Sequence, residues 1–414
     1  MSRAVHIIGA GLAGLAAAVR LAGQGLQVVV HEAAPQAGGR CRSYHDQTLG
    51  MPIDNGNHLV LSGNRATLDY LRTIGSEDRL IGPAEAAIDF VDLATGARWT
   101  LRPNNGPVPW WIVDPGRRVP GTTAFDYLAA GARLLRASPK QRICDAVACE
   151  GTLYRRLLHP LLLAALNTEP PAGSAALARA VITETLGAGG AACRPLIARD
   201  GLGPAFIDPA LRFVERHGGS VRFGHRLRAI ATSGDRVVTL DFGEDAIRLG
   251  ADEAAVLAVP PPVAAALVPG LTAPTEFRAI VNAHFRIAPP AGLPPMIGVI
   301  NGLVEWIFAF PDRLAVTISA ADRLLDMPRE DLAAAVWRDV AEVASPGAGM
   351  PAWQIVRERR ATFAATPEQD AKRPGSRTRW TNLAIAGDWT ATGLPATIEG
   401  AIRSGNRAAE TLVS

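Results

Sequence analysis

The first 32 residues alternate between short, mostly apolar runs and one longer apolar segment. Ala4–Ile8 and Leu26–Val30 have the length of strands, and Leu15–Gln24 between them ends before Gly25. Short apolar runs are typical of strands buried on both faces, whereas the longer segment fits a helix. The pattern predicts a strand, a glycine turn, a helix and a second strand, which is the opening unit of a parallel α/β fold.

The predicted turn contains three glycines at the spacing of a dinucleotide-binding motif. Gly9 permits the tight turn, Gly11 lets the backbone approach a pyrophosphate, and Gly14 lets the helix lie close to the strand. The helix N-terminus then offers free N–H groups and the positive end of its dipole to phosphate. Glu32 follows the second strand, where a carboxylate accepts hydrogen bonds from ribose hydroxyls and disfavours a 2′-phosphate. The motif predicts a dinucleotide site.

Strand-like and helix-like segments of the same kind occur again in two later parts of the chain. A helix is expected over 205–217 and strands over 220–223, 227–231 and 255–259, and a buried strand, Leu383–Ala386, runs into Gly387 and Asp388. These segments resemble those that rejoin the nucleotide-binding domain in the flavin amine oxidase and phytoene desaturase superfamily, and the resemblance implies an α/β fold with a Rossmann-type nucleotide-binding domain and an interleaved α+β substrate domain. The expected boundaries are 1–83, 201–268 and 376–414 for the nucleotide-binding domain, and 84–200 and 269–375 for the substrate domain.

Composition and charge exclude several classes of protein. The chain has 414 residues, of which 48% are hydrophobic and 20% charged, so it has enough apolar residues for sizeable cores. The net charge is only +3, and no basic run alternates with aromatic residues, so we expect no nucleic-acid partner. The four cysteines form no CxxC pair, so we expect neither structural zinc nor another metal. Because they also form no dense disulfide framework, we expect the protein to work in the reducing cytoplasm. No apolar stretch is long enough to span a membrane.

Motifs at both ends of the chain indicate which dinucleotide is bound. Gly38-Gly39-Arg40, with Ser43 after it, resembles the element that follows the Rossmann unit in the flavin amine oxidase and phytoene desaturase superfamily. The resemblance implies FAD. It also implies that Arg40 and the backbone of the two glycines bind phosphate, that Gly387 and Asp388 lie beside the pyrophosphate and ribityl chain, and that the backbone at Thr397 and Ile398 points at the flavin ring.

Within this superfamily, amine oxidases carry a lysine in a strand equivalent to Ile280–Phe285, where this chain has Asn282. Three other segments, 54–63, 160–170 and 199–202, resemble the hydroxysqualene dehydroxylase branch. That resemblance implies reduction of a C30 allylic alcohol to squalene in bacterial squalene and hopanoid biosynthesis. A carotenoid-type desaturase or isomerase, and an isoprenoid-binding escort without flavin chemistry, remain as alternatives.

The branch resemblance also suggests site residues. Gly56, Asn57 and His58 belong to the segment that the family brings close to the flavin ring. His58 either protonates the leaving oxygen as a general acid, since an unperturbed histidine titrates near neutrality, or packs against the flavin while water supplies the proton. Asn167 either contacts substrate or ends the apolar helix before it. Four aromatic residues either line an apolar tunnel or belong to the core and surface: Trp110, Trp111, Trp306 and Phe308.

An isoprenoid substrate would also affect where the protein is located in the cell. Because such molecules partition into lipid, we expect peripheral contact with the inner face of the cell membrane, without a spanning helix. The oligomeric state is not predicted.

Overall fold

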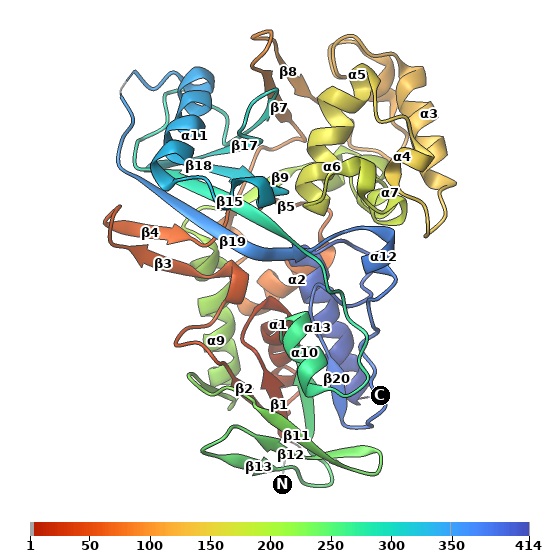
Figure 1. Ribbon diagram of the computed structural model, residues 1–414, viewed down its shortest axis with the longest axis vertical. Coiled ribbons are helices and arrows are strands. Elements are labelled where there is room, and N and C mark those ends of the chain that lie inside the picture. Colours follow the sequence, from red (N-terminus) through yellow and green to blue (C-terminus); the bar gives the residue numbers. More distant parts are fainter. Residues whose placement is uncertain (1–3, 348, 414) are drawn as a thin grey trace.

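A parallel sheet of five strands forms the lower half of the computed structural model, which describes residues 4–347 and 349–413 (Figure 1). All neighbouring strands in this sheet are parallel, with Ile7 paired to both Val30 and Val256. In spatial order the strands are β10 (Ser220–Arg222), β2 (Gln27–His31), β1 (Ala4–Ile8), β14 (Ala254–Leu257) and β20 (Leu383–Ile385).

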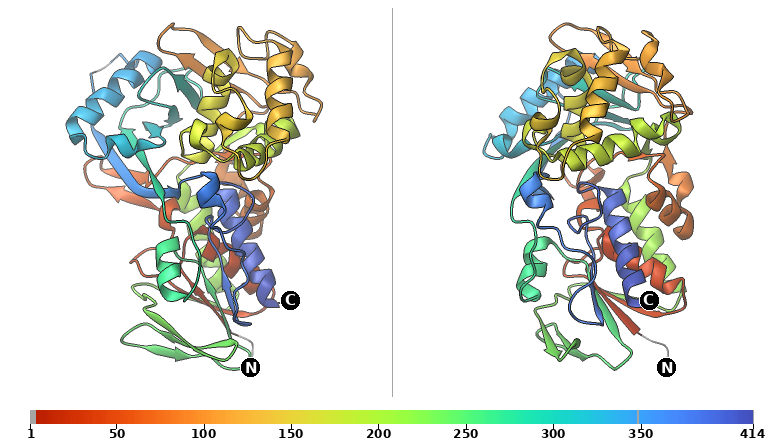
Figure 2. Two further views of the ribbon diagram at one scale, coloured as in Figure 1. Left: turned by 45° about the vertical axis from the view of Figure 1, so that its right-hand side comes forward. Right: turned by 90° about the vertical axis from the view of Figure 1, so that its right-hand side faces the viewer.

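Alternation along the strands gives this sheet two buried faces. Val5 and Ile7 contribute to a core with helices α1 and α13, whereas Ile8 and Leu257 contribute to a second core on the other face. Helix α1 (Leu12–Ala22) packs closely on α13 (Ile398–Val413), and both run beside the sheet (Figure 2). A Cβ at Gly405 would lie 2.1 Å from the carbonyl oxygen of Ala13, so only glycine permits this approach.

The upper half contains a mixed sheet of seven strands. Within β17, Ile307 packs on helix α11 (Arg329–Ala344) in one core, whereas Trp306, Phe308 and Phe310 belong to an aromatic core on the opposite face. The strands in spatial order are β19 (Trp353–Phe363), β15 (Phe277–Phe285), β18 (Arg313–Ile318), β17 (Trp306–Phe310), β16 (Met296–Ile300), β7 (Ile88–Asp92) and β8 (Arg98–Leu101).

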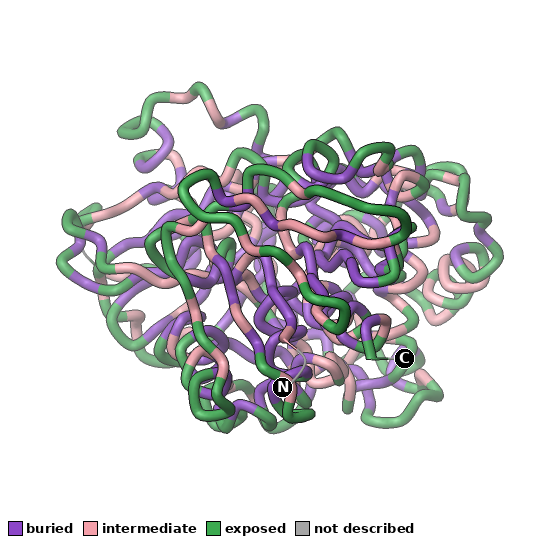
Figure 3. Tube along the Cα trace, turned by 90° about the horizontal axis from the view of Figure 1, so that it is seen from below, coloured by how far each residue is buried: buried purple, intermediate pink, exposed green. Residues whose placement is uncertain are grey.

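Smaller sheets and helices complete the fold. The remaining strands are β3 (Ser43–Asp46), β4 (Met51–Asp54), β5 (Val60–Leu61), β6 (Leu80–Ile81), β9 (Pro195–Ala198), β11 (Ala229–Ser233), β12 (Arg236–Asp241) and β13 (Ala246–Arg248). The remaining α-helices are α2 (Arg65–Ile74), α3 (Ala124–Leu135), α4 (Ile143–Ala146), α5 (Gly151–Leu153), α6 (His159–Leu166), α7 (Ala175–Glu184), α8 (Gly190–Cys193), α9 (Asp208–Arg216), α10 (Pro261–Leu267) and α12 (Pro367–Asp370). Buried residues gather in the interior, and exposed residues lie along the outer loops and helices (Figure 3).

The predicted element boundaries were partly wrong. The first helix begins at Leu12 rather than Leu15, because the turn needs only residues 9–11 and Gly14 already lies in the helix. The helix expected over 205–217 is a π-helical turn, η7 (Gly203–Ile207), followed by α9. The strand expected over 227–231 lies at 229–233.

The strands of the two large sheets come from the stretches assigned to the two domains. β9, however, comes from the predicted substrate domain and pairs with β5 and β6 from the predicted nucleotide-binding domain. The exact domain boundaries stay a prediction.

Candidate active site

The glycine turn at the end of β1 leaves an opening at the N-terminus of α1. Gly9 has φ +107°, and a Cβ there would lie 2.4 Å from the carbonyl oxygen of Ala258. A Cβ at Gly14 would lie 1.9 Å from the carbonyl oxygen of Gly9. At Gly11, the N-cap residue of α1, a Cβ would meet nothing within 4 Å. Gly9 and Gly14 are therefore required by packing, whereas Gly11 borders open space at the positive end of a helix.

Glu32 ties the end of β2 to this turn. Its Oε2 accepts a hydrogen bond from the backbone N–H of Ala10 at 2.7 Å, and its Oε1 accepts one from Ala34 at 2.8 Å. A carboxylate has acceptor capacity left after two such bonds, so the predicted contact with ribose hydroxyls is compatible with this geometry.

The second pair of glycines lies against the first turn. Gly38 has φ +110° and donates its backbone N–H to the carbonyl oxygen of Ala10 at 2.9 Å, and a Cβ at Gly39 would lie 3.5 Å from Cα of Gly11. Positive φ at both positions favours glycine. The two phosphate-binding elements predicted from separate motifs are thus brought together.

Arg40 and Asp388, which were assigned to separate cofactor groups, form an ion pair with each other. The guanidinium Nη2 lies 2.8 Å from Oδ1 of Asp388, and Nη1 donates to the carbonyl oxygen of Ala361 at 2.5 Å. Burial alone would lower the pKa of Arg40, but Asp388 outweighs it and the pKa is raised. Arg40 therefore stays charged beside the glycine turns.

Side chains beside this ion pair are accessible to solvent. The Arg40 side chain is 43% exposed, and His58 is partly exposed. The neighbouring Leu59 is also exposed. These side chains are therefore open to contact by a bound molecule.

The loop after β4 lies against Asn282 of β15. A Cβ at Gly56 would lie 3.2 Å from Nδ2 of Asn282 and 3.7 Å from Nε2 of His58. The backbone N–H of Asn57 donates to Oδ1 of Asn282 at 3.4 Å, and its Nδ2 donates to the carbonyl oxygen of Val316 at 3.1 Å. Oδ1 of Asn57 is buried and has no hydrogen-bond partner among the described residues. It is an unused hydrogen-bond acceptor in the loop that lies next to His58.

The surroundings of His58 shift the pKa of its ring. Burial and the charge of Arg40 lower its pKa to about 4, although a hydrogen bond to the backbone of Arg40 and the Asp388 charge oppose this. The pKa of His58 is therefore below that of an unperturbed histidine, and the ring is neutral at pH 7. A neutral imidazole has one N–H donor, which here goes to the backbone of Arg40, and one free acceptor nitrogen.

The C-terminal motif closes the site from the other side. Gly387 has φ +149° and donates its backbone N–H to Oγ of Ser404 at 2.8 Å. Oγ1 of Thr397 accepts the backbone N–H of Gly400 at 3.0 Å, which caps α13, and Ile398 is the first residue of that helix. Thr397 and Ile398 therefore lie at the positive end of a long helix.

Comparisons with known proteins agree with this geometry. Residues 12–413 match the family model described as flavin containing amine oxidoreductase. Hydroxysqualene dehydroxylase of Rhodopseudomonas palustris is 59% identical, covering 100% of this chain and 99% of the relative, and that of Zymomonas mobilis is 47% identical, with 99% of each chain covered. The chain belongs to the hydroxysqualene dehydroxylase family.

Solved structures support the same fold at much lower identity. Putrescine oxidase has a TM-score of 0.70 with 18% identity, and a putative protoporphyrinogen oxidase from Exiguobacterium has a TM-score of 0.67 with 18% identity; each match covers 100% of this chain and 99% of the other. Like the wider flavin family, this member of the hydroxysqualene dehydroxylase family is an FAD-dependent oxidoreductase. The open helix N-terminus at Gly11 and the unused acceptor of Asn57 fit such a cofactor.

The structure separates the residues predicted to contact the substrate of this dehydroxylase family member. Trp111, Trp306 and Phe308 lie together in the aromatic core. Trp306 is paired with Thr317, whose Oγ1 accepts a hydrogen bond from Nδ2 of Asn57 at 3.3 Å. The aromatic core therefore begins next to the loop after β4.

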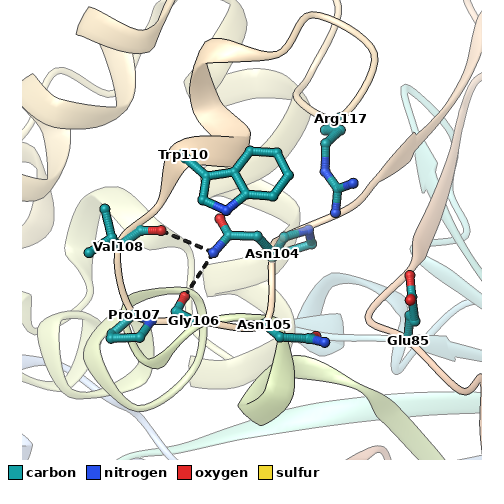
Figure 4. A pocket seen from close by; sticks show the side chains of 9 residues that line it. Glu85, Asn104, Asn105, Gly106, Pro107, Val108, Trp110 and Arg117 are labelled. Carbon is teal, nitrogen blue, oxygen red and sulfur yellow. Dashed lines mark hydrogen bonds between the residues drawn. The ribbon is translucent and has the colours of Figure 1, made fainter.

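Trp110 does not join that core. It is 51% exposed, whereas Trp111 is 2% exposed, because successive side chains of the short turn η3 (Trp110–Val113) point in different directions. Trp110 instead lines a surface cavity of about 520 Å³, together with Asn104, Val108 and Arg117 (Figure 4). None of the nucleotide-motif residues lines this cavity, so it is not the reaction site.

Asn167 ends helix α6, as the second of its two interpretations had it. It has φ +46° and is 2% exposed. Its Nδ2 donates to the carbonyl oxygen of Arg278 and to Oγ1 of Thr362, and its Oδ1 accepts the backbone N–H of Ala320 at 2.7 Å. The amide is fully engaged in joining α6 to the mixed sheet, which argues against substrate contact.

Sequence reasoning missed Glu305. This carboxyl precedes β17, and its Oε2 accepts the backbone N–H of Ser319 at 2.9 Å. Burial raises its pKa to about 7, although the hydrogen bonds with Ser319 oppose the shift. A single acid within the apolar stretch 303–310 was the available signal.

Proposed function

We propose that this chain reduces hydroxysqualene to squalene, as part of bacterial squalene and hopanoid biosynthesis. The observation that carries the proposal is full-length similarity, at 59% and 56% identity, to proteins named hydroxysqualene dehydroxylase. These relatives do not favour the carotenoid-type desaturase or the escort protein that sequence reasoning left open.

The overall reaction replaces a hydroxyl group by hydrogen. Reduced FAD, when bound, supplies the hydride that goes to the allylic carbon, and the hydroxyl group takes up a proton and leaves as water. The protein must hold the substrate, exclude other water and assist the departing oxygen. Trp111, Trp306 and Phe308 lie in the buried aromatic core near Asn57, and their contact with the substrate is part of the proposal.

We assign the cofactor contacts to the glycine turns and to the residues packed around them. The glycine turns would face the pyrophosphate, with Arg40 supplying positive charge beside them, and Glu32 would accept from the ribose. Asp388 holds Arg40 in place. The proposed cofactor residues are Gly9, Gly11, Gly14, Glu32, Gly38, Gly39, Arg40, Gly56, Asn57, Gly387, Asp388, Thr397 and Ile398.

His58 is proposed to assist the departing oxygen through a water molecule. Its lowered pKa supports a neutral ring at pH 7, whose one N–H donates to the backbone of Arg40, so the other ring nitrogen is left to accept a hydrogen bond from the water that protonates the oxygen. In a single-turnover test with prereduced enzyme, His58→Ala should slow oxidation by hydroxysqualene, and His58→Gln should restore part of the rate because an amide oxygen still accepts. Equal rates for all three proteins would remove His58 from the reaction.

The substrate suggests where the enzyme works. Among residues 4–347 and 349–413, no helix combines the length and apolarity needed to cross a bilayer. We propose a cytoplasmic protein that makes peripheral contact with the inner face of the membrane, where a long isoprenoid is dissolved.

The decisive experiment is anaerobic. Hydroxysqualene should oxidise the prereduced flavin and yield squalene by mass spectrometry, whereas phytoene should leave the oxidised flavin unchanged. Flavin reduction by phytoene, with no squalene formed from hydroxysqualene, would overturn the proposal in favour of a desaturase. A purified protein that binds no FAD would support an escort instead.

A further inference from the structure

The most exposed large apolar side chains of the described chain are concentrated in one short segment. Eleven such residues are exposed, and the six with the greatest exposure all lie between 108 and 135. Three belong to α3, namely Phe125 (75%), Leu128 (58%) and Leu135 (62%). The others are Val108, Trp110 and Val113, in and around η3. A concentration of exposed apolar side chains of this kind is typical of an interaction site.

Helix α3 is apolar on two opposite sides. At 100° per residue, Phe125, Leu128 and Leu135 lie along one stripe, and these are the exposed positions. Tyr127 and Leu134 lie on the opposite side and face the protein. A helix that packs on one side needs no apolar residues on the other, so the outer stripe of α3 requires another explanation.

The turn η3 and helix α3 are packed against each other. The rings of Trp111 and Tyr127 meet edge to face at 5.1 Å, and the backbone N–H of Val119 donates to the hydroxyl of Tyr127 at 3.0 Å. These contacts join the two elements on their inner sides. In the right-hand view of Figure 2, α3 lies on the side of the molecule that faces the viewer, away from the parallel sheet.

Basic residues lie within this segment and on both sides of it. Residues 108–135 contain three basic and two acidic residues, whereas the wider range 102–142 contains seven basic and two acidic residues and has a net charge of +5 in a chain whose total is +3. None of the seven forms an ion pair within the described part of the chain; they are Arg102, Arg117, Arg118, Arg133, Arg136, Lys140 and Arg142. Asp126, one of the two acids, is occupied in capping α3.

We propose that the outer face of η3 and α3 docks on a bilayer containing anionic phospholipid. Apolar side chains flanked by arginine and lysine match an interface with hydrocarbon below and phosphate groups around it. A second copy of the chain would offer only half of this match, because it would place the same positive charge opposite itself. The inference deepens the proposed function and rests on it in one respect, namely that a bilayer is where a C30 isoprenoid is found.

The test is vesicle sedimentation of the FAD-loaded full chain. Wild type should bind vesicles of phosphatidylcholine with phosphatidylglycerol more strongly than vesicles of phosphatidylcholine alone, and high salt should weaken this binding. The variant Phe125→Ser with Leu128→Ser should bind about tenfold more weakly, and Arg133→Glu with Arg136→Glu should abolish the preference for the anionic lipid. The matched control is Val263→Ser with Met350→Ser, two exposed apolar residues elsewhere, which should bind like wild type.

Flavin absorbance and thermal midpoint establish that each variant is folded. Wild type that fails to sediment with anionic vesicles, or Phe125 and Leu128 variants that bind as well as wild type, would overturn the inference. So would a dimer in analytical ultracentrifugation that becomes monomeric in these variants, since a second copy would then cover the face. Squalene formation in detergent solution is measured separately, so loss of the docking proposal leaves the proposed reaction standing or falling on its own assay.

Discussion

An added methyl group would have room at Gly11 but would collide with the backbone at Gly14. Alanine substitutions at these two positions should therefore separate an effect on cofactor binding from an effect on folding. At Gly11 φ is −76°, which any residue adopts, and a Cβ meets nothing within 4 Å. At Gly14 a Cβ would lie 1.9 Å from the carbonyl oxygen of Gly9, far inside van der Waals contact. The first methyl group projects into the opening at the helix N-terminus, and the second collides with the backbone.

The expected free energies follow from these contacts. Overpacking typically costs about 1–3 kcal/mol, and a backbone collision this close belongs at the upper end, so Gly14→Ala should lower the free energy of unfolding by about 2 kcal/mol or more even after the gain in helix propensity. Gly11→Ala should change the stability of the FAD-free protein by less than about 1 kcal/mol, because a small entropic gain opposes a poorer N-cap. If its methyl group removes one charge-assisted hydrogen bond to phosphate, FAD should bind about 10- to 150-fold more weakly.

Two measurements decide the matter. Thermal unfolding of the FAD-free proteins reports stability, and fluorescence titration with FAD reports affinity. Gly131→Ala in α3 is the control, since its Cβ also meets nothing within 4 Å but lies outside the nucleotide motif. If Gly11→Ala bound FAD like wild type, the pyrophosphate would not lie at this turn. If Gly14→Ala unfolded at the wild-type temperature, the packing argument would be wrong.

Three further predictions test other parts of the structure. Asp388→Asn removes the charge partner of Arg40, and it should weaken FAD retention on gel filtration while lowering the free energy of unfolding by only about 1 kcal/mol, because Arg40 is 43% exposed. Asn167→Ala breaks the hydrogen bonds of a buried amide and should cost about 2–4 kcal/mol in urea unfolding, with KM unchanged in the folded fraction; a raised KM at unaltered stability would restore a substrate role. The pKa of Glu305 is raised from 4.5 to about 7 in the folded state, so its protonated form adds stability that is fully present below pH 4.5 and is lost as the pH rises to 7, by about 3 kcal/mol at most. Glu305→Gln should therefore gain stability over wild type in thermal scans from pH 5 to pH 8, and parallel pH profiles for the two proteins would refute the assignment.

The opening strand, glycine turn, helix and strand could be predicted because their requirements are local. Gly9 needs a positive φ and Gly14 needs the absence of a Cβ, and both demands arise within a few residues of the turn. The parallel sheet could be predicted because its strands are short apolar runs in the sequence. The limits of the first helix were shifted by three residues at its start, because a pattern of apolar residues does not say at which residue a turn becomes a helix.

What the sequence alone determined, then, is the class of fold, the nucleotide motif and the family to which the chain belongs, since these depend on residue type and spacing. Only the tertiary structure paired Arg40 with Asp388, 348 positions apart, and left Trp110 at the surface while burying Trp111. Only packing lowered the pKa of His58 and gave α3 an uncovered apolar side. Charge pairing, desolvation and exposure are set by which distant segments come into contact, and no local pattern contains that information.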